Sequence, residues 1–228
     1  MQTSLLKQCV AEFIGTFTLI FIGIGAIYHF GEIPGGLLAI ALAHGLAIAV
    51  MVSATGGISG GHLNPAVTFG LLIGGKINLM KSIAYWIAQL TGATAAAFLL
   101  LFIFKHQPDT DAAQIIANGT PQLAANGISY VQGIVIEAVL TFFLVFVVYG
   151  SAVDGRAPKI GGLAIGLTVA LDILFGGPFT GAAMNPARTF GPALVSSTWI
   201  DHSVYWIGPM LGGGLAGLIY GRFLIKQP

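Results

Sequence analysis

Hydrophobic residues along this chain fall into long, nearly uninterrupted blocks. Six blocks have the length of helices that cross a membrane, at about 8–29, 36–55, 82–104, 129–151, 160–176 and 203–225. A spanning helix needs about 20 predominantly apolar residues. The blocks are rich in glycine and alanine, as expected where helices pack closely in lipid. The pattern predicts an all-α membrane protein with six transmembrane helices.

Two shorter apolar segments lie between the second and third blocks and between the fifth and sixth, at 64–74 and 185–196. At about 1.5 Å per residue each would cover roughly 16 Å, about half of a hydrocarbon core. Both begin with Asn-Pro, which pairs a favoured capping residue with a favoured first-turn residue. These segments are therefore predicted to be re-entrant half-helices.

The runs before the half-helices, 56–61 and 176–181, are rich in glycine and predicted to be irregular. Irregular backbone survives at membrane depth only when it is buried in protein or faces a water-filled cavity. The two runs therefore favour a watery path beside them, which is an argument for a pore.

The two halves of the chain repeat one another. The stretch 11–17 resembles 136–142, and the stretch 61–70 resembles 182–191. An odd number of spans per repeat places the halves in opposite orientations, so that the half-helices meet near the midplane. We expect one channel domain over 1–228, with repeats at about 1–104 and 129–228 joined by an extracellular loop, 105–128.

Composition supports the membrane assignment, because 56% of the residues are hydrophobic and only 7% are charged. No basic patch indicates nucleic acid. The lone Cys9 excludes an internal disulfide and a cysteine metal cluster. No motif brings a nucleophile, a base and oxyanion donors together, so neither an enzyme nor a cofactor or metal is predicted.

Basic residues predict the orientation, since cytoplasmic loops carry an excess of lysine and arginine. With the N-terminus inside, one side receives Lys7, Lys76, Lys81, Arg156, Lys159, Arg222 and Lys226. Lys105 falls on the other side, and Arg188 lies within the second half-helix. Both termini are thus expected in the cytoplasm, with the plasma (inner) membrane as the expected location.

Two Asn-Pro-Ala boxes, one after Gly-Gly-His-Leu and one running into Arg-Thr-Phe-Gly-Pro-Ala, resemble the signature of the aquaporin family. The resemblance covers nearly the whole chain and lies closest to the plant tonoplast subfamily. It implies a water channel in a lipid bilayer that assembles as a homotetramer with one pore per subunit. It assigns the midplane of the pore to the box residues Asn64, Pro65, Ala66, Asn185, Pro186 and Ala187.

The two boxes suggest how protons would be excluded. Two helix N-termini that meet in mid-membrane present positive dipole ends and spare amide donors, and the asparagines add NH₂ donors. Water at that point can only accept from them, which would break a proton-conducting chain and repel cations, as already described for aquaporins. Simple helix capping is the alternative role for Asn64 and Asn185, and capping and exclusion are compatible.

Arg188 is costly inside an apolar half-helix unless it faces protein or water. A buried salt bridge that only stabilises the fold is the alternative. By resemblance Arg188 forms a narrow outer filter with His44, Ile173 and Ala182. Strict water filters of the family carry an aromatic residue on span two and a histidine on span five, so this filter departs from that pattern.

Backbone carbonyls of the irregular runs are expected to line the pore: Gly60, Gly61, His62, Leu63, Gly181, Ala183 and Met184. Glu12 and Glu137 are acids inside the membrane, for which proton coupling is one hypothesis. Support of the re-entrant loops through hydrogen bonds from backbone N–H groups is the other, and the symmetric duplication favours it. Asp172 fits neither set, and bonding to loop amides near the outer mouth is one interpretation.

Three classes of function remain open: a passive channel, a secondary transporter and a structural membrane protein. Within the first class there are two candidate ranges of solutes. A passive channel for water, with ammonia and hydrogen peroxide as further candidate solutes, fits the carbonyl row. A glycerol or small-solute facilitator is the alternative, although Thr189 after the arginine, in place of an acid, argues against it by resemblance. An ion-coupled transporter would need a charged pair at the midplane. A structural membrane protein would need a filter plugged by large side chains.

Overall fold

A computed structural model describes residues 3–106, 111–123, 127–158 and 160–225 of the chain. Within these ranges the backbone is helical apart from turns and connecting segments, and no strand is present. The α-helices are α1 (Leu5–Phe30), α2 (Gly36–Thr55), α3 (Pro65–Ile73), α4 (Leu79–Phe104), α5 (Ala112–Asn118), α6 (Tyr130–Val148), α7 (Gly161–Thr180), α8 (Pro186–Ser196) and α9 (Val204–Leu218).

Six helices match the predicted spans. Helices α1, α2, α4, α6 and α7 are long and apolar enough to cross a membrane. Helix α9 continues as the π-helical segment η3 (Ile219–Leu224), and α6 continues as η2 (Tyr149–Val153). The boundaries differ from the predicted ones by a few residues, most at the end of span five. The prediction of an all-α membrane protein is confirmed.

The half-helices α3 and α8 begin directly after the asparagine of each box. The Asn64 side chain accepts a hydrogen bond from the backbone N–H of Ala66 at 2.8 Å, and Asn185 accepts one from Ala187 at 3.0 Å. Proline occupies the first helical turn in both. Capping thus accounts for where each half-helix begins, as its sequence predicts.

The run at 176–181 is helical for most of its length, contrary to the prediction. The sequence predicts irregular backbone there, but α7 remains helical through Thr180 with Pro178 inside it. A proline near the end of a helix removes only one late hydrogen bond, and Gly177 before it has no Cβ to clash with the ring. The N–H of Gly181 still bonds to the carbonyl of Gly177, so the chain leaves the helix only at 181.

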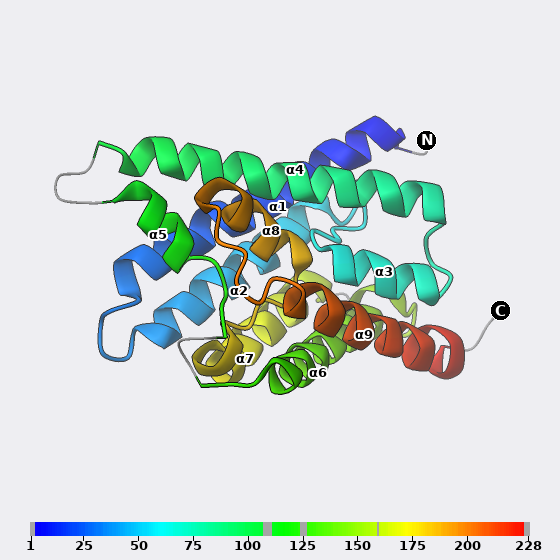
Figure 1. The fold of residues 1–228 in the computed structure, drawn as a ribbon. Coiled ribbons are helices and arrows are strands. Elements are labelled where there is room, and N and C mark those ends of the chain that lie inside the picture. Colours follow the sequence, from blue (N-terminus) through cyan, green and yellow to red (C-terminus); the bar gives the residue numbers. More distant parts are fainter. Residues whose placement is uncertain (1–2, 107–110, 124–126, 159, 226–228) are drawn as a thin grey trace.

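The segment at 105–128, expected to be a loop, contains the short helix α5. Asp111 begins it, because its side chain accepts hydrogen bonds from the backbone N–H groups of Ala113 and Gln114. Helix α5 packs against α8 and α4. Figure 1 shows it at the end of the bundle opposite the two chain ends. We call the α5 end outer and the end with the termini inner.

Close helix crossings hold the bundle together. The main pairs are α1 with α4, α6 with α9, and α2 with α7. At the α2–α7 crossing, a Cβ added to Gly166 would lie 2.3 Å from the carbonyl oxygen of Gly45. Only glycine permits this approach, which matches the use of small residues between membrane helices.

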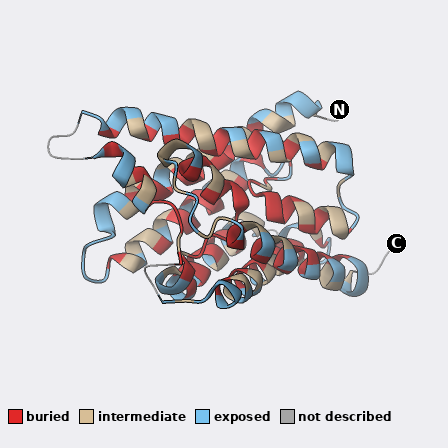
Figure 2. Cartoon of the chain, in the orientation of Figure 1, coloured by how far each residue is buried: buried red, intermediate tan, exposed pale blue. Residues whose placement is uncertain are grey.

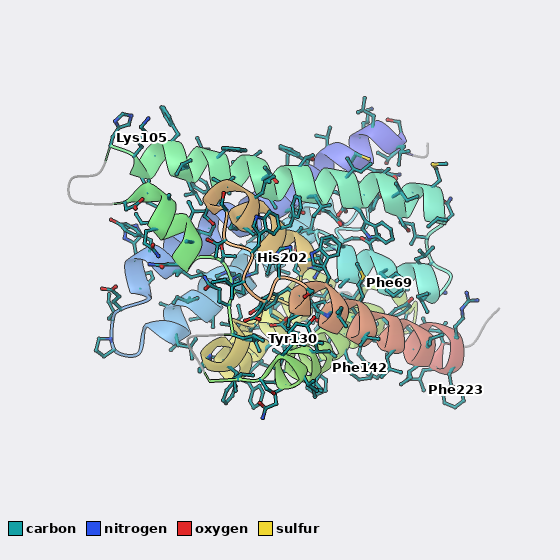
Figure 3. All side chains as sticks on the ribbon, viewed as in Figure 1. Phe69, Lys105, Tyr130, Phe142, His202 and Phe223 are labelled. Atoms are coloured by element: carbon teal, nitrogen blue, oxygen red, sulfur yellow. The ribbon has the colours of Figure 1, made fainter. Side chains whose placement is uncertain are left out.

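Burial follows the same arrangement. Figure 2 shows buried residues along the inward faces of the helices and around α3 and α8, while the outward faces are exposed. Those outward faces carry large apolar side chains, among them Leu38, Leu42, Leu46 and Val50 on α2. Figure 3 shows the exposed Phe223 projecting from the bundle at its inner end. An apolar exterior around a packed interior is the arrangement expected of a protein whose solvent is lipid.

Candidate functional site: a central passage

The two re-entrant segments are joined to each other at the centre of the molecule. The side-chain NH₂ of Asn64 donates to the carbonyl of Met184 at 2.8 Å, and that of Asn185 donates to the carbonyl of Leu63 at 3.0 Å. Each asparagine oxygen caps its own half-helix. We call these two reciprocal bonds the asparagine cross-brace. They leave one N–H of each amide free to meet a solute.

The approach to each box has the same unusual backbone in both halves. Gly60, Gly61 and Leu63 have positive φ angles of 99°, 61° and 53°. Gly181, Ala182 and Met184, in the matching positions, have angles of 78°, 44° and 52°. Left-handed backbone is costly for leucine, methionine and alanine, and persists only where the surroundings determine it.

Glu12 supplies that support in the first half. One carboxylate oxygen accepts from the Ser59 hydroxyl at 2.6 Å and the N–H of His62 at 3.0 Å. The other accepts from the N–H of Leu63 at 2.6 Å and the side-chain NH₂ of Gln89 at 2.8 Å. An acid that accepts four donors acts as an ionised, acceptor-only carboxylate.

Glu137 makes the matching contacts in the second half. It accepts from the hydroxyl of Thr180 at 2.6 Å, the N–H of Ala183 at 2.9 Å and the N–H of Met184 at 2.7 Å. Both glutamates are fully buried and neither lines the central passage. These contacts favour loop support over proton coupling.

A passage runs through the molecule beside these loops. An outer cavity of about 430 Å³ and an inner cavity of about 830 Å³ are joined by a narrow section of about 30 Å³. The narrow section shares Ile173 and Arg188 with the outer cavity, and Gly61 and His62 with the inner one. Since about 10–15 Å³ is needed to hold one water, the narrow section has room for a short file of waters.

All four predicted filter residues line the narrow section. His44, Ile173, Ala182 and Arg188 are between 0% and 6% exposed. The Nδ1 of His44 lies 2.9 Å from the carbonyl of Ile40. Because a carbonyl only accepts, Nδ1 carries the proton and neutral His44 offers Nε2 as an acceptor.

Arg188 offers donors at the same place. Its Nε and Nη1 atoms are buried and have no hydrogen-bond partner among the described residues. The one ion pair in the described part of the chain joins Arg156 to Asp154, so the salt-bridge alternative for Arg188 finds no partner there. A buried guanidinium whose donors lack protein partners favours a position beside a water-filled path, where its charge is compensated.

The predicted carbonyl row is altered by the asparagine cross-brace. The carbonyl of Leu63 accepts from Asn185 and from Thr16, and Leu63 is not among the residues that line the narrow section. The carbonyl of Met184 accepts from Asn64. These two carbonyls therefore connect the loops. Of the other predicted positions, Gly61, His62, Ala183 and Met184 line the narrow section, Gly60 lines the inner cavity and Gly181 the outer one.

Some residues at the site were not found from the sequence. Gln89 and Thr68 join the Glu12 network, but a single polar side chain in a helix carries no motif. Gly23 leaves space for the imidazole of His44, because a Cβ there would lie 2.4 Å from Nε2. Inverted symmetry could have indicated Tyr85 and Tyr205, which donate to the carbonyls of Ser59 and Thr180.

The position of Asp172 does not match the predicted role of bonding to loop amides near the outer mouth. It lies on α7 in a groove of about 650 Å³ between α6 and α7, beside Leu140 and Phe143, and away from the central passage. Its Oδ2 atom has no hydrogen-bond partner in the described residues, and no bond to a loop amide is found there.

At the inner end, outside the spans, Asp154 and Arg156 form a tight pair. The Arg156 guanidinium, which donates to the carboxylate, holds the pKa of Asp154 well below its ordinary value. Arg156 also donates to the carbonyl of Leu224 at 3.3 Å. The pair thus ties the connection between α6 and α7 to the end of η3. Lys159 and Lys226, which the orientation prediction used, lie outside the described residues.

Comparisons with known proteins agree with this geometry. The family model described as major intrinsic protein matches residues 1–220. A protein named aquaporin TIP4-1 from Arabidopsis thaliana is 48% identical, with 98% of this chain and 88% of the relative covered. Aquaporin TIP2-1 from Zea mays is 46% identical, with 96% and 88% covered. The X-ray structure of the aquaglyceroporin from Plasmodium falciparum superposes with a TM-score of 0.85 at 26% identity, covering 97% of both chains.

Proposed function

This chain belongs to the major intrinsic protein family, and on that premise we propose that it is a passive water channel in a membrane it crosses several times. The observation that carries the proposal is that the narrow section shares lining residues with the outer cavity on one side and with the inner cavity on the other. The names of the relatives support water as the main solute.

The asparagine cross-brace supports exclusion of protons and ions. One N–H of each amide is used to bridge the loops, and the other is left for a water at the midplane. Since both asparagine oxygens are engaged by their own helices, that water finds donors only. It must point its own hydrogens away from the centre in both directions. A file with opposite orientations on its two sides does not relay a proton.

The outer filter supports passage of water and discrimination against larger solutes. Arg188 supplies a guanidinium whose Nε and Nη1 have no partner among the described residues, and His44 supplies an acceptor, whereas Ile173 and Ala182 present apolar walls. A solute that sheds water there loses about 1–3 kcal/mol for each buried hydrogen bond left unmade. Ammonia has fewer strong bonds to replace than glycerol. We therefore propose that ammonia and hydrogen peroxide pass alongside water and that glycerol passes slowly.

The competing functions find less support. The residues that line the narrow section include no acid, so no carboxylate–base pair is placed there for ion coupling. A structural protein with a plugged filter would not need the two cavities that meet at Arg188 and Ile173. The likeness to an aquaglyceroporin concerns the fold, while the relatives of higher identity are named aquaporins.

We also propose the finer organisation predicted from the sequence. Repeats at about 1–104 and 129–228 are supported by the matching loops and glutamates of the two halves. A common side for both termini is supported by Figure 1, and the cytoplasmic side by the basic residues Lys76, Arg156 and Arg222. A homotetramer, which the family resemblance implies, is compatible with the exposed Leu38, Leu42, Leu46 and Val50 on α2, which a neighbouring subunit can cover as well as lipid. The plasma (inner) membrane expected from the sequence gains no support from relatives of the TIP type.

Stopped-flow light scattering on proteoliposomes tests the water-channel proposal. The protein should raise osmotic water permeability well above that of empty vesicles, with the low activation energy of a water-filled path. A matched sample with Asn185→Leu, which removes one arm of the asparagine cross-brace, should lose most of the increment. Flux no faster than lipid alone from folded wild-type protein would contradict the proposal.

The filter assignment has a separate test in the same vesicles. Ile173→His adds a polar group to the narrowest ring and should lower ammonia flux more than water flux. Ile173→Leu, which keeps the wall apolar, is the control and should leave the ratio of the two fluxes nearly unchanged. Equal losses of both solutes in Ile173→His, or a wild type closed to ammonia, would refute this filter and leave the water channel standing.

A further inference from the structure

His62 lies at the junction between the narrow section and the inner cavity. It is among the residues that line both. Its ring packs edge-on against Tyr85 with centroids 5.0 Å apart. A Cβ at Gly60 would lie 3.2 Å from the Cδ2 and Nε2 atoms, so the glycine leaves this edge of the ring open. The imidazole therefore has a fixed place beside the water path, in addition to the backbone position predicted for it.

One edge of the ring is bound and the other is not. The Nδ1 of His62 lies 3.1 Å from the hydroxyl oxygen of Thr68. No hydrogen bond to Nε2 is found within the described part of the chain, and Nε2 is not among its buried unpartnered atoms. The atom free to meet water is thus Nε2. Whether it donates or accepts depends on which nitrogen carries the proton.

The Thr68 hydroxyl decides this question. Its oxygen lies 3.0 Å from the carbonyl of Asn64, 3.1 Å from the side-chain nitrogen of Gln89 and 3.1 Å from the Nδ1 of His62. A hydroxyl has one proton and two lone pairs. If the proton goes to the Asn64 carbonyl, the lone pairs accept from Gln89 and from Nδ1–H of His62, and all three contacts are hydrogen bonds. If the proton goes to His62, the contact with Asn64 has none.

The orientation of Gln89 is fixed independently. Its side-chain nitrogen also lies 2.8 Å from the carboxylate of Glu12. Because an ionised carboxylate only accepts, the NH₂ group must face Glu12 and Thr68, and the amide cannot turn its oxygen toward them. Gln89 therefore always donates to the Thr68 hydroxyl, which leaves that hydroxyl one lone pair and one proton for its other two contacts.

This network is confined to the inner half of the molecule. At the position matching His62 the second half has Ala183, and at the position matching Gln89 it has Pro209. Neither can take part in such a chain. Thr189, which matches Thr68, donates to the carbonyl of Pro186 instead. The arrangement is therefore not a by-product of the loop support that both halves share.

We propose that Thr68, with Gln89 donating to its hydroxyl, is a positioning residue that holds His62 with its proton on Nδ1. Nε2 then presents a hydrogen-bond acceptor to the water file on the inner side. Water that leaves the boxes inward points its hydrogens toward the inner end, and an acceptor there matches that orientation. The opposite tautomer would present a donor and oppose it. The inference rests on the proposed water path, although the tautomer itself is measurable without any flux.

The direct test is nitrogen NMR of protein labelled at histidine and reconstituted in lipid at neutral pH. The His62 resonances are identified as those lost in His62→Asn. We expect a protonated-type Nδ1 and an unprotonated-type Nε2 in the wild type and in Thr68→Ser, which keeps the hydroxyl. Thr68→Val should shift the ring toward a protonated Nε2 or a mixture. An Nε2-protonated wild type, or a tautomer unchanged in Thr68→Val, would overturn the proposal.

Measurement of water flux tests whether the His62 tautomer matters for conduction. Water permeability per folded channel should fall roughly threefold to tenfold in Thr68→Val, the effect of losing about one hydrogen bond along the path, and should stay near wild type in Thr68→Ser. Gln89→Leu leaves the Thr68 hydroxyl its contacts with Asn64 and His62, so it should keep the wild-type tautomer. A wild type without water flux would sink the channel proposal while the tautomer result stands. An altered tautomer with unchanged flux would reject the role of Nε2 in conduction.

Discussion

Ala182 is the residue at which a small change reaches the water path most directly. It is fully buried and lines the narrow section. Its left-handed backbone, with a φ angle of 44°, already carries a Cβ atom, to which Ala182→Cys adds only a sulfur. The native thiol, Cys9, lies in a separate groove with Val10 and Phe13, none of which lines the passage.

We therefore predict that mercurials leave wild-type water flux nearly unchanged and strongly block Ala182→Cys, because a bound mercury would fill the narrowest ring. Stopped-flow measurement before and after addition, with reversal by a reducing thiol, checks this. Reversible inhibition of the wild type that disappears in Cys9→Ala would show that the groove and the passage communicate.

His202, in the outer connection before α9, is expected to make stability depend on pH. Trp206 donates to its Nε2 at 3.0 Å, and burial lowers the pKa of the imidazole below its ordinary value of 6.5. Between the two pKa values, His202 is therefore protonated in the unfolded chain and neutral in the folded chain. Stability should be full above about pH 6.5 and fall as the pH drops through that value.

Thermal unfolding in detergent at pH 7.5 and 5.5 measures the effect. His202→Gln keeps an acceptor for Trp206 but does not titrate, so its loss of stability at the lower pH should be smaller than that of the wild type. The same loss in both proteins would place the pH dependence elsewhere.

At the scale of elements, the α2–α7 crossing depends on glycine at two facing positions. Gly166→Ala would bring a Cβ to 2.3 Å from the carbonyl oxygen of Gly45 on α2. Since backbone cannot move aside cheaply, we expect a loss of about 1–3 kcal/mol, as for other overpacked interiors. The melting temperature should fall by roughly 2–4 °C for each kcal/mol.

Gly25→Ala is the matched control. Gly25 also lies within a spanning helix, but an added Cβ there meets nothing within 4 Å. Alanine is the better helix former by up to about 1 kcal/mol, so this variant should be neutral or slightly more stable. If both alanines lower stability equally, the close crossing is not what Gly166 provides.

The elements also show what the sequence could and could not predict. The half-helices were predictable because Asn64 and Asn185 cap them locally, and local chemistry is visible in sequence. The helical run up to Thr180 was missed because Pro178 and its neighbouring glycines usually end a helix, and packing overrode that preference. The roles of Gln89 and Thr68 depend on contacts between distant helices, which no local pattern reveals.

For the whole molecule, the proposed orientation predicts which end of the bundle a thiol reagent reaches from outside the cell. In a Cys9→Ala background, Lys105→Cys places a thiol at the outer end and Lys76→Cys places one at the inner end. Both positions are exposed, and Figure 3 shows Lys105 at the end that carries α5.

In intact cells an impermeant maleimide should label Lys105→Cys and spare Lys76→Cys until detergent opens the membrane. The reverse pattern would invert the proposed orientation without altering the fold. Labelling of both sites in intact cells would indicate a mixed population of orientations.

The asparagine cross-brace has a consequence for how the chain is made. Asn64 finds its partner at Met184, and Leu63 finds its partner at Asn185, so neither half contains both members of a bond. When only the first half has been synthesised, the Asn64 side chain lacks its partner at Met184 and the Leu63 carbonyl keeps only the hydrogen bond from Thr16. An unsatisfied polar group is costly inside a bilayer. We therefore expect the first half to complete its fold only after the second half has been synthesised and these two hydrogen bonds have formed. If the chain is divided after α5 and the two fragments are co-expressed, they should associate and restore water flux. Either fragment expressed alone should be degraded.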